Sequence, residues 1–248
     1  MKFRKAYLFF VTFFLFILIW HILILFLDIN QTLFPTPEKV IASLRYNDKL
    51  ALDIGISLFR LISGSSIGIF CAVAFGIITG TIAYYNNTLG QLSNFLRFIP
   101  PLALIPLFLV WFGIGEFSKV SLLAWAAFFP VWISTFNGVK SIEGRYLLVA
   151  KSLGVKRLFM LKEIILKGSL NYIINGARIG VGIAFSVLIA AEMLGSSAGM
   201  GYRIFLYQAY YRVDLMIAYI IILGTIGLVV DRLFLLLAEK LTPWKNEI

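Results

Sequence analysis

Long apolar runs, separated by short polar or glycine-containing segments, dominate this chain of 248 residues. A helix needs about 20 mostly apolar residues to cross the hydrocarbon core of a bilayer. Six segments reach or nearly reach that length, and we expect each to form a transmembrane helix. Their approximate bounds are residues 6–27, 56–83, 98–114, 118–137, 172–195 and 214–238.

Composition favours helices over a β-barrel. Apolar residues make up 60% of the chain and the mean hydropathy is +0.93, so most of the chain has no aqueous surface to cover. Only helices and closed barrels satisfy the backbone within lipid, and barrel strands alternate apolar with polar residues. The unbroken runs therefore predict an all-α membrane protein. We expect a single domain over residues 1–248, with its core at about 56–240.

The distribution of basic residues predicts the orientation. The formal net charge is +10, and Lys and Arg concentrate in the cytoplasmic segments of membrane proteins, so this charge does not call for a nucleic-acid partner. With the N-terminus inside, thirteen basic residues fall on inner segments and six on outer ones. Both termini are therefore predicted to be cytoplasmic. The first apolar run is longer than that of a cleaved secretory signal, so we expect it to remain as an anchor.

Few side chains are suited to chemistry. Cys71 is the only cysteine and His21 the only histidine, which excludes an internal disulfide framework, a thiolate zinc site and a histidine pair. A phosphate-binding loop needs a Gly-Lys pair, and the chain has none. We expect no cofactor, no metal and no catalytic residue. Any transport must draw its energy from another chain or an ion gradient, or proceed passively.

Residues 28–55 form the one long outer connection. Pro35 and Pro37 stop any helix at its start, because proline lacks a backbone N–H. Residues 38–52 are amphipathic and predict a helix lying in the membrane interface.

The segment 138–171 fits a plain bundle least well. It carries seven basic and two acidic residues and no span. Its length suits two helices: one begins at Ser141 or Glu143 and ends before Gly154, where glycine suits a left-handed stop, and the other runs from about Lys156 to Leu166. Apolar residues lie among the charges. Such a surface on a cytoplasmic hairpin either binds a partner protein or lies against the bundle or the lipid headgroups.

This segment also begins a resemblance to a known family. The sequence Ala-Lys-Ser-Leu-Gly at 150–154, followed after nine residues by Ile-Ile-Leu at 164–166, resembles the cytoplasmic signature loop of bacterial binding-protein-dependent ABC permeases. That loop reads Glu-Ala-Ala, three residues, Gly, nine residues, Ile, any residue, Leu-Pro. Further matches resemble the sulfonate, nitrate and taurine subfamily: Leu-Phe-Pro-Thr-Pro at 33–37, Ile-Pro-Pro-Leu-Ala-Leu-Ile-Pro-Leu at 99–107, Trp-Phe-Gly-Ile-Gly-Glu at 111–116, and Ala-Glu-Met-Leu-Gly at 191–195 with Gly199 and Gly201.

Four positions depart from the family pattern. Leu148 stands in place of the signature glutamate, Val149 in place of its first alanine and Lys167 in place of its proline. Asn171 stands where the subfamily usually has a further proline. The apolar replacements keep a docking surface while losing one polar contact.

The resemblance implies a MetI-like permease fold in the bacterial inner membrane, with a cytoplasmic coupling helix that fits a groove on an ATPase subunit. It also implies an extracytoplasmic solute-binding protein and a permease homodimer. A small anion such as a sulfonate, nitrate or taurine is the implied solute. The residues expected to contact the ATPase are Leu147, Leu148, Val149, Ala150, Lys151, Leu153, Gly154, Ile164 and Leu166.

Charged residues within spans are costly, at about 2.5–3.5 kcal/mol near a helix centre, so they need an explanation. Arg60 and Arg178 either extend to the headgroups or line a solute path. Arg178 and Glu192 are fourteen residues apart, which places them on roughly one face of a helix. The small residues between them indicate a packed or pore-lining face. The candidate path residues are Arg60, Pro100, Pro101, Arg178, Glu192 and Met193.

Two other functions compete with an ABC permease. A stand-alone secondary transporter or channel would work without an ATPase, but such proteins usually contain internal repeats, which this sequence does not show. An intramembrane enzyme would need paired acids or a histidine cluster inside the membrane. The single histidine and the scattered acids argue against it.

Overall fold

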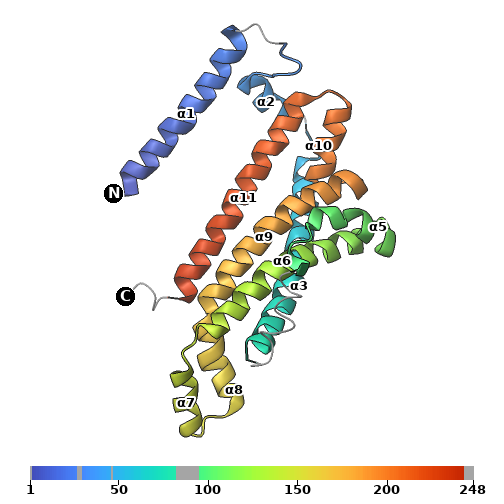
Figure 1. The fold of residues 1–248 in the computed structure, drawn as a ribbon. Coiled ribbons are helices and arrows are strands. Elements are labelled where there is room, and N and C mark those ends of the chain that lie inside the picture. The colour runs from blue at the N-terminus through green and yellow to red at the C-terminus, as the bar shows by residue number, and fades with distance from the viewer. Residues whose placement is uncertain (1, 27–29, 46, 82–94, 243–248) are drawn as a thin grey trace.

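A computed structural model describes residues 2–26, 30–45, 47–81 and 95–242 of the chain (Figure 1). Helices are the only regular secondary structure in these ranges, as the apolar runs predict. Four helices are long and apolar enough to cross a membrane. They are α3 (Leu50–Thr81), α6 (Glu116–Lys140), the continuous helix Arg157–Gly195, which ends in α9 (Lys167–Gly195), and α11 (Val213–Leu241).

The first and third predicted spans are also helical, in α1 (Lys2–Phe26) and in the pair η2 (Pro101–Leu104) and α5 (Ile105–Phe112). The third is shorter than the predicted 98–114. Its twelve residues extend about 18 Å, whereas the hydrocarbon core is about 30 Å thick. Pro100 holds an extended backbone before it, and Gly113, at φ +76°, ends it. The split between the third and fourth spans is therefore real, and the third alone is too short to cross.

The core of the fold is the packing of α3, α6 and α9. Apolar side chains such as Leu123 and Leu188 are fully buried between them. Small residues let the helices approach closely: a Cβ on Gly68 of α3 would lie 2.4 Å from the Ala124 carbonyl oxygen of α6. A Cβ on Gly180 of α9 would lie 2.8 Å from the Ala127 carbonyl oxygen. Because these contacts join backbone to backbone, the three helices form one tightly packed unit.

Two sets of short helices lie at opposite ends of this unit (Figure 1). One end carries the hairpin of α7 (Gly144–Ser152), α8 (Arg157–Phe159) and η3 (Met160–Leu166), with the C-terminal end of α11 directed toward it. The other end carries α2 (Pro37–Leu44) and α10 (Met200–Ala209).

Three boundaries correct the sequence prediction. The amphipathic segment 38–52 is not one helix, because α2 ends at Leu44 and α3 already begins at Leu50. Helix α10 lies in a segment predicted only as an outer connection. The second hairpin helix does not end near Leu166 but continues without a break into α9, through a π-helical stretch. A π-helical stretch adds a residue to a turn and is often found at functional positions.

Candidate functional site

The hairpin between α6 and α9 has the turn that its sequence predicts. Glu143, in an extended conformation, precedes the first residue of α7. After α7, Gly154 adopts a φ of +67°. The N–H of Gly154 donates to the Lys151 carbonyl and the N–H of Val155 donates to the Ala150 carbonyl, each at 3.0 Å. This pair of bonds is a Schellman motif, in which glycine is favoured because it tolerates the left-handed backbone.

Large apolar side chains are exposed around this turn. Leu153 is 74% exposed, Leu148 is 67% exposed and Leu158 is 63% exposed, and Val149 and Phe159 are exposed as well. Exposed basic residues surround them: Arg145, Lys151, Lys156, Arg157 and Lys162. The result is an apolar tip with a basic rim, which we call the hairpin tip.

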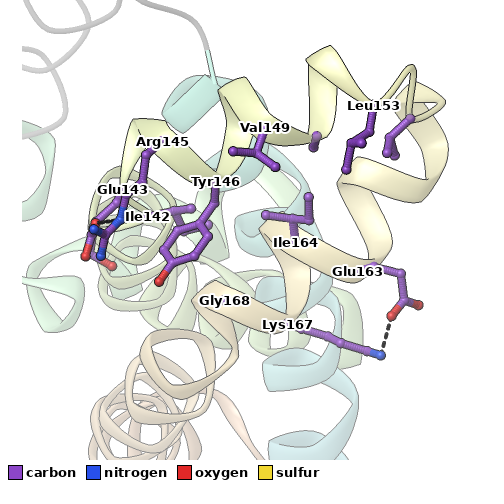
Figure 2. A pocket seen from close by; sticks show the side chains of 13 residues that line it. Ile142, Glu143, Arg145, Tyr146, Val149, Leu153, Glu163, Ile164, Lys167 and Gly168 are labelled. Carbon is purple, nitrogen blue, oxygen red and sulfur yellow. Dashed lines mark hydrogen bonds and ion pairs between the residues drawn. The ribbon is translucent and has the colours of Figure 1, made fainter.

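A groove of about 840 Å³ lies between α7 and η3, next to the hairpin tip (Figure 2). Val149, Leu153 and Ile164 give it an apolar lining. Glu163 and Lys167, which form an ion pair, lie on its far side. The groove is open, so the apolar lining of the hairpin is accessible from outside the bundle.

The predicted coupling residues differ in their accessibility. Leu148, Val149, Lys151, Leu153, Gly154 and Leu166 are exposed, Leu147 and Ile164 are half-buried, and Ala150 is buried. Ala150 and the buried Ile165 therefore fix the hairpin, while the exposed members are free to contact another molecule.

At the opposite end of the bundle, a carboxylate is fully buried among hydrogen-bond donors. Glu192 of α9 is 0% exposed. It accepts hydrogen bonds from the Arg60 guanidinium at 2.8 Å, from the Ser57 hydroxyl at 2.8 Å and from the backbone N–H of Gly201 at 2.8 Å. A buried charge is stable when it is both paired and hydrogen-bonded, and Glu192 meets both conditions.

Arg60 connects Glu192 with a second carboxylate. Its Nε donates to Oε2 of Glu116 at 2.6 Å, and its Nη2 donates to Oε1 of the same residue, in a bidentate pair. Arg60 also donates to the Ala198 carbonyl at 2.8 Å. The Arg60 side chain is only 4% exposed, whereas the Glu116 side chain is 55% exposed. The expectation that Arg60 extends to the headgroups is therefore wrong, because two acidic residues from other helices hold it inside the protein.

Comparison with known proteins identifies the family. Residues 64–243 match the family described as binding-protein-dependent transport system inner membrane component. The chain belongs to this family. A putative ABC transporter permease protein of Methanocaldococcus jannaschii is 37% identical over 238 residues, which cover 93% of this chain and 89% of that protein. A putative aliphatic sulfonates transport permease protein of Bacillus subtilis is 34% identical over 233 residues, which cover 93% and 84%.

A solved structure supports the fold assignment. A chain of the MetNI methionine ABC transporter, in an inward-facing conformation, matches with a TM-score of 0.67 at 16% identity, over 78% of this chain and 96% of that one. The protein is thus an ABC importer permease with the MetI-like fold, an inner membrane component that forms the path for a small solute. Membership of this family confirms the ABC permease interpretation over a stand-alone transporter.

The remaining candidate path residues of the permease are spread over its length. Arg178 of α9 does not reach Glu192 but forms a bidentate pair with Asp231 of α11, and both side chains are about two-fifths exposed. Pro100 is exposed, and Pro101 and Met193 are half-buried. Among these candidate path residues, Arg60 and Glu192 are the pair that a salt bridge joins.

The small residues of α9 divide between two faces. Gly176 and Gly180 pack against α6, and this confirms close helix packing for these two small residues. Gly182 has open space around it, and Ser186 is exposed. Among the described residues, no group of three or more His, Cys, Asp and Glu side chains is arranged to hold a metal ion.

Sequence reasoning did not assign a role to Ser57 or Asp53, both fully buried near Glu192. In the sequence they are visible only as polar residues at the edge of an apolar run. Glu116 was easier to find from the sequence, because it is the last residue of the segment 111–116 that resembles the subfamily.

Proposed function

We propose that the hairpin tip is the surface through which a separate ATPase subunit drives this permease. The observation that carries the proposal is the set of large apolar side chains exposed at the end of the bundle, of which Leu148, Val149 and Leu153 lie outside the four candidate membrane spans. An exposed apolar patch of this kind is typical of a protein–protein contact. The open groove beside it offers a partner both an apolar surface and a charged edge.

The orientation follows from the same surface. The basic rim of the hairpin tip suits the cytoplasmic side, so α10 and the buried network of Glu192 lie toward the outside. We infer that both termini are cytoplasmic, that an extracytoplasmic binding protein delivers solute to the α10 end, and that two copies of the chain form one path. The domain remains single over residues 1–248, with the hairpin inside segment 138–171.

We further propose that the solute is a small anion, with sulfonates as the first class to test. The Bacillus subtilis relative is named for aliphatic sulfonates, and this chain is similar to it over nearly its whole length. The half-exposed Arg178 gives α9 a cation beside the small residues Gly182 and Ser186. These residues, with Arg60, Pro100, Pro101, Glu192 and Met193, remain the proposed surroundings of the path.

Co-purification of the ATPase with tagged permease tests the coupling surface. Leu148→Asp places a charge in the apolar tip, and Gly154→Glu adds a side chain and strain at the left-handed turn, so both variants should lose at least nine-tenths of the bound ATPase. Ile41→Asp is the matched control, because Ile41 is 65% exposed but lies on α2 at the other end. Intact complex from Leu148→Asp, or loss of complex from Ile41→Asp, would contradict the proposal.

Uptake into proteoliposomes tests the solute class. The vesicle membrane contains the complete importer. Labelled methanesulfonate should accumulate in these vesicles only when ATP and binding protein are present, and unlabelled sulfonate should compete with it. Accumulation of a neutral solute with no effect of sulfonate would show that the anion assignment is wrong while leaving the coupling surface intact.

A further inference from the structure

The first turn of α10 is held by side chains from other helices. The backbone N–H of Gly199 donates to Asp53 at 3.0 Å, that of Met200 donates to the Ser57 hydroxyl at 2.9 Å, and that of Gly201 donates to Glu192 at 2.8 Å. Three consecutive N–H groups are thus satisfied by three side chains, two from α3 and one from α9. We call these three side chains the α10 clamp.

The clamp combines two favourable effects. The first N–H groups of a helix have no partner inside the helix, so side-chain acceptors are needed when the helix start is buried. The same end of the helix carries partial positive charge, which favours the carboxylates of Asp53 and Glu192. Ser57 connects the start of α10 with Glu192, because its hydroxyl accepts a hydrogen bond from the Met200 N–H and donates one to Glu192.

The fit around Gly199 leaves little freedom. Its φ is +114°, and a Cβ there would lie 2.5 Å from Oε1 of Glu192 and 2.8 Å from Nη1 of Arg60. Met200 is 0% exposed. The start of α10 therefore has one position relative to α3 and α9, and any movement of those helices moves α10 with them.

A second set of bonds extends this hold along α10. Asp53 also accepts from Nε of Arg203 at 2.7 Å and from the Tyr219 hydroxyl at 3.1 Å. Partial burial opposes the charge on Arg203, but the hydrogen bond to Asp53 and the attraction of its negative charge act together with smaller contributions from Tyr207 and Tyr219 and raise the pKa of Arg203. Asn47 donates to the hydroxyls of Tyr207 and Tyr219, each at 3.1 Å.

The clamp is continuous with the helices that carry the hairpin tip. Helix α6 leads into α7, and the helix that follows the hairpin runs unbroken from Arg157 to Gly195, so Glu192 lies on the same helix as the exposed Leu158. The clamp therefore joins α10, at one end of the molecule, to the element that bears the hairpin tip at the other.

From this arrangement we propose that Asp53, Ser57 and Glu192 are positioning residues that couple events at the outer helix α10 to ATP hydrolysis by the ATPase subunit bound at the hairpin tip. The proposal rests on the proposed function, in which α10 lies outside and the ATPase binds the hairpin. The clamp makes α10 part of the α3–α9 unit, so that engagement of the solute-loaded binding protein at the outer end is transmitted as a movement of α9.

Ser57→Ala tests the proposal with the smallest change. It leaves the Met200 N–H without its acceptor, and loss of one buried hydrogen bond corresponds to about a tenfold change in a conformational equilibrium. In the assembled importer, stimulation of ATP hydrolysis by solute-loaded binding protein should fall about tenfold, while hydrolysis without binding protein stays at the control level and the melting temperature falls by only a few degrees, as the loss of one buried hydrogen bond implies for a chain of this size. The control is Ser65→Ala, on the same helix, because the buried Ser65 hydroxyl has no hydrogen-bond partner among the described residues.

Several outcomes separate the possibilities. A merely structural role would lower basal and stimulated hydrolysis in the same proportion and leave their ratio unchanged, and that result would overturn the proposal, as would full stimulation in Ser57→Ala. If Ser57→Ala fails to assemble, Asp53→Asn, which keeps the shape and removes the charge, is judged by the same ratio. Failure of the wild-type chain to bind the ATPase would instead contradict the proposed function.

Discussion

The two ends of this permease differ in which side chains they expose and which they bury. At the hairpin tip, large apolar residues such as Leu148 and Leu153 are exposed, and backbone hydrogen bonds close the turn. At the α10 end, charged residues such as Glu192 and Asp53 are fully buried, and each accepts hydrogen bonds from several donors. The usual arrangement of apolar inside and polar outside is therefore reversed at both ends.

The difference indicates what each end does. Apolar surface left exposed still has free energy to release on binding a partner, whereas a buried and saturated polar network has none. The hairpin is thus suited to a contact that another chain completes, and the α10 end to a fixed arrangement within the chain. Substitutions should accordingly affect stability at the α10 end and association at the hairpin.

The largest loss of stability is expected from Arg60→Met. The buried Glu192 would lose its cationic partner, and breaking a buried ion pair on one side costs about 3–5 kcal/mol. Thermal and denaturant unfolding of the purified permease would measure this loss. Arg212→Met is the control, since the Arg212–Asp214 pair lies at the same end but is partly exposed and should contribute less than about 1 kcal/mol. Equal losses in the two variants would contradict the view that burial sets the cost.

The next largest difference between the ends is expected from alanine at Gly154 and at Gly199, two of the three described glycines with positive φ. At Gly154 the penalty is the backbone conformation alone, about 1–2 kcal/mol, because a Cβ there meets open space. At Gly199 the contact with Glu192 adds an overpacking cost of about 1–3 kcal/mol. The free energy of unfolding should therefore fall further for Gly199→Ala. A Gly154→Ala variant that is the less stable of the two would reverse the comparison.

A smaller effect is expected for Tyr219→Phe. The change removes a hydroxyl that donates to Asp53 and accepts from Asn47, and an unsatisfied buried group costs about 1–3 kcal/mol. The exposed Tyr210→Phe should leave the unfolding free energy nearly unchanged. If both variants melt at the wild-type temperature, the network contributes no stability through this hydroxyl.

The smallest effect on stability is expected at the hairpin. Leu153→Ser replaces a side chain that is 74% exposed, so the unfolding free energy of the isolated permease should change by less than about 0.5 kcal/mol. The same variant should bind the ATPase measurably less tightly in a pull-down titration. The fully buried Leu123→Ser provides the contrast, with a loss of several kcal/mol. A destabilised Leu153→Ser would mean that the tip belongs to the core.

The sequence was most informative where structure is local. The long apolar helices and the turn at Gly154 follow from hydropathy and glycine placement, and the structure agrees. Periodicity left open whether the apolar residues around the turn are exposed or lie against the bundle or the lipid headgroups. The length of the third helix could not be read from hydropathy, because Pro100 and Gly113 limit it through backbone geometry rather than polarity. Helix α10 was missed because its stability comes from Asp53, Ser57 and Glu192 rather than from its own composition.

The partners of charged residues were beyond sequence reasoning for a related reason. Glu116 and Glu192 lie 56 and 132 residues from Arg60, and only the packing of α3, α6 and α9 brings the three together. The spacing along one helix placed Arg178 and Glu192 on roughly one face. In the structure each forms an ion pair with a residue of another helix. A periodic pattern fixes a face of a helix, but it does not say which helix covers that face.

The unbroken helix from Arg157 to Gly195 has a mechanical consequence. Its 39 residues reach about 58 Å at 1.5 Å per residue, so a tilt of only about 5° displaces one end by about 5 Å relative to the other. The close contacts of Gly176 and Gly180 with α6 lie near the middle of this helix, so they are the point about which it would tilt. In the orientation proposed above, a push of a few ångströms at the hairpin tip would be converted into a sideways displacement of comparable size at the α10 end.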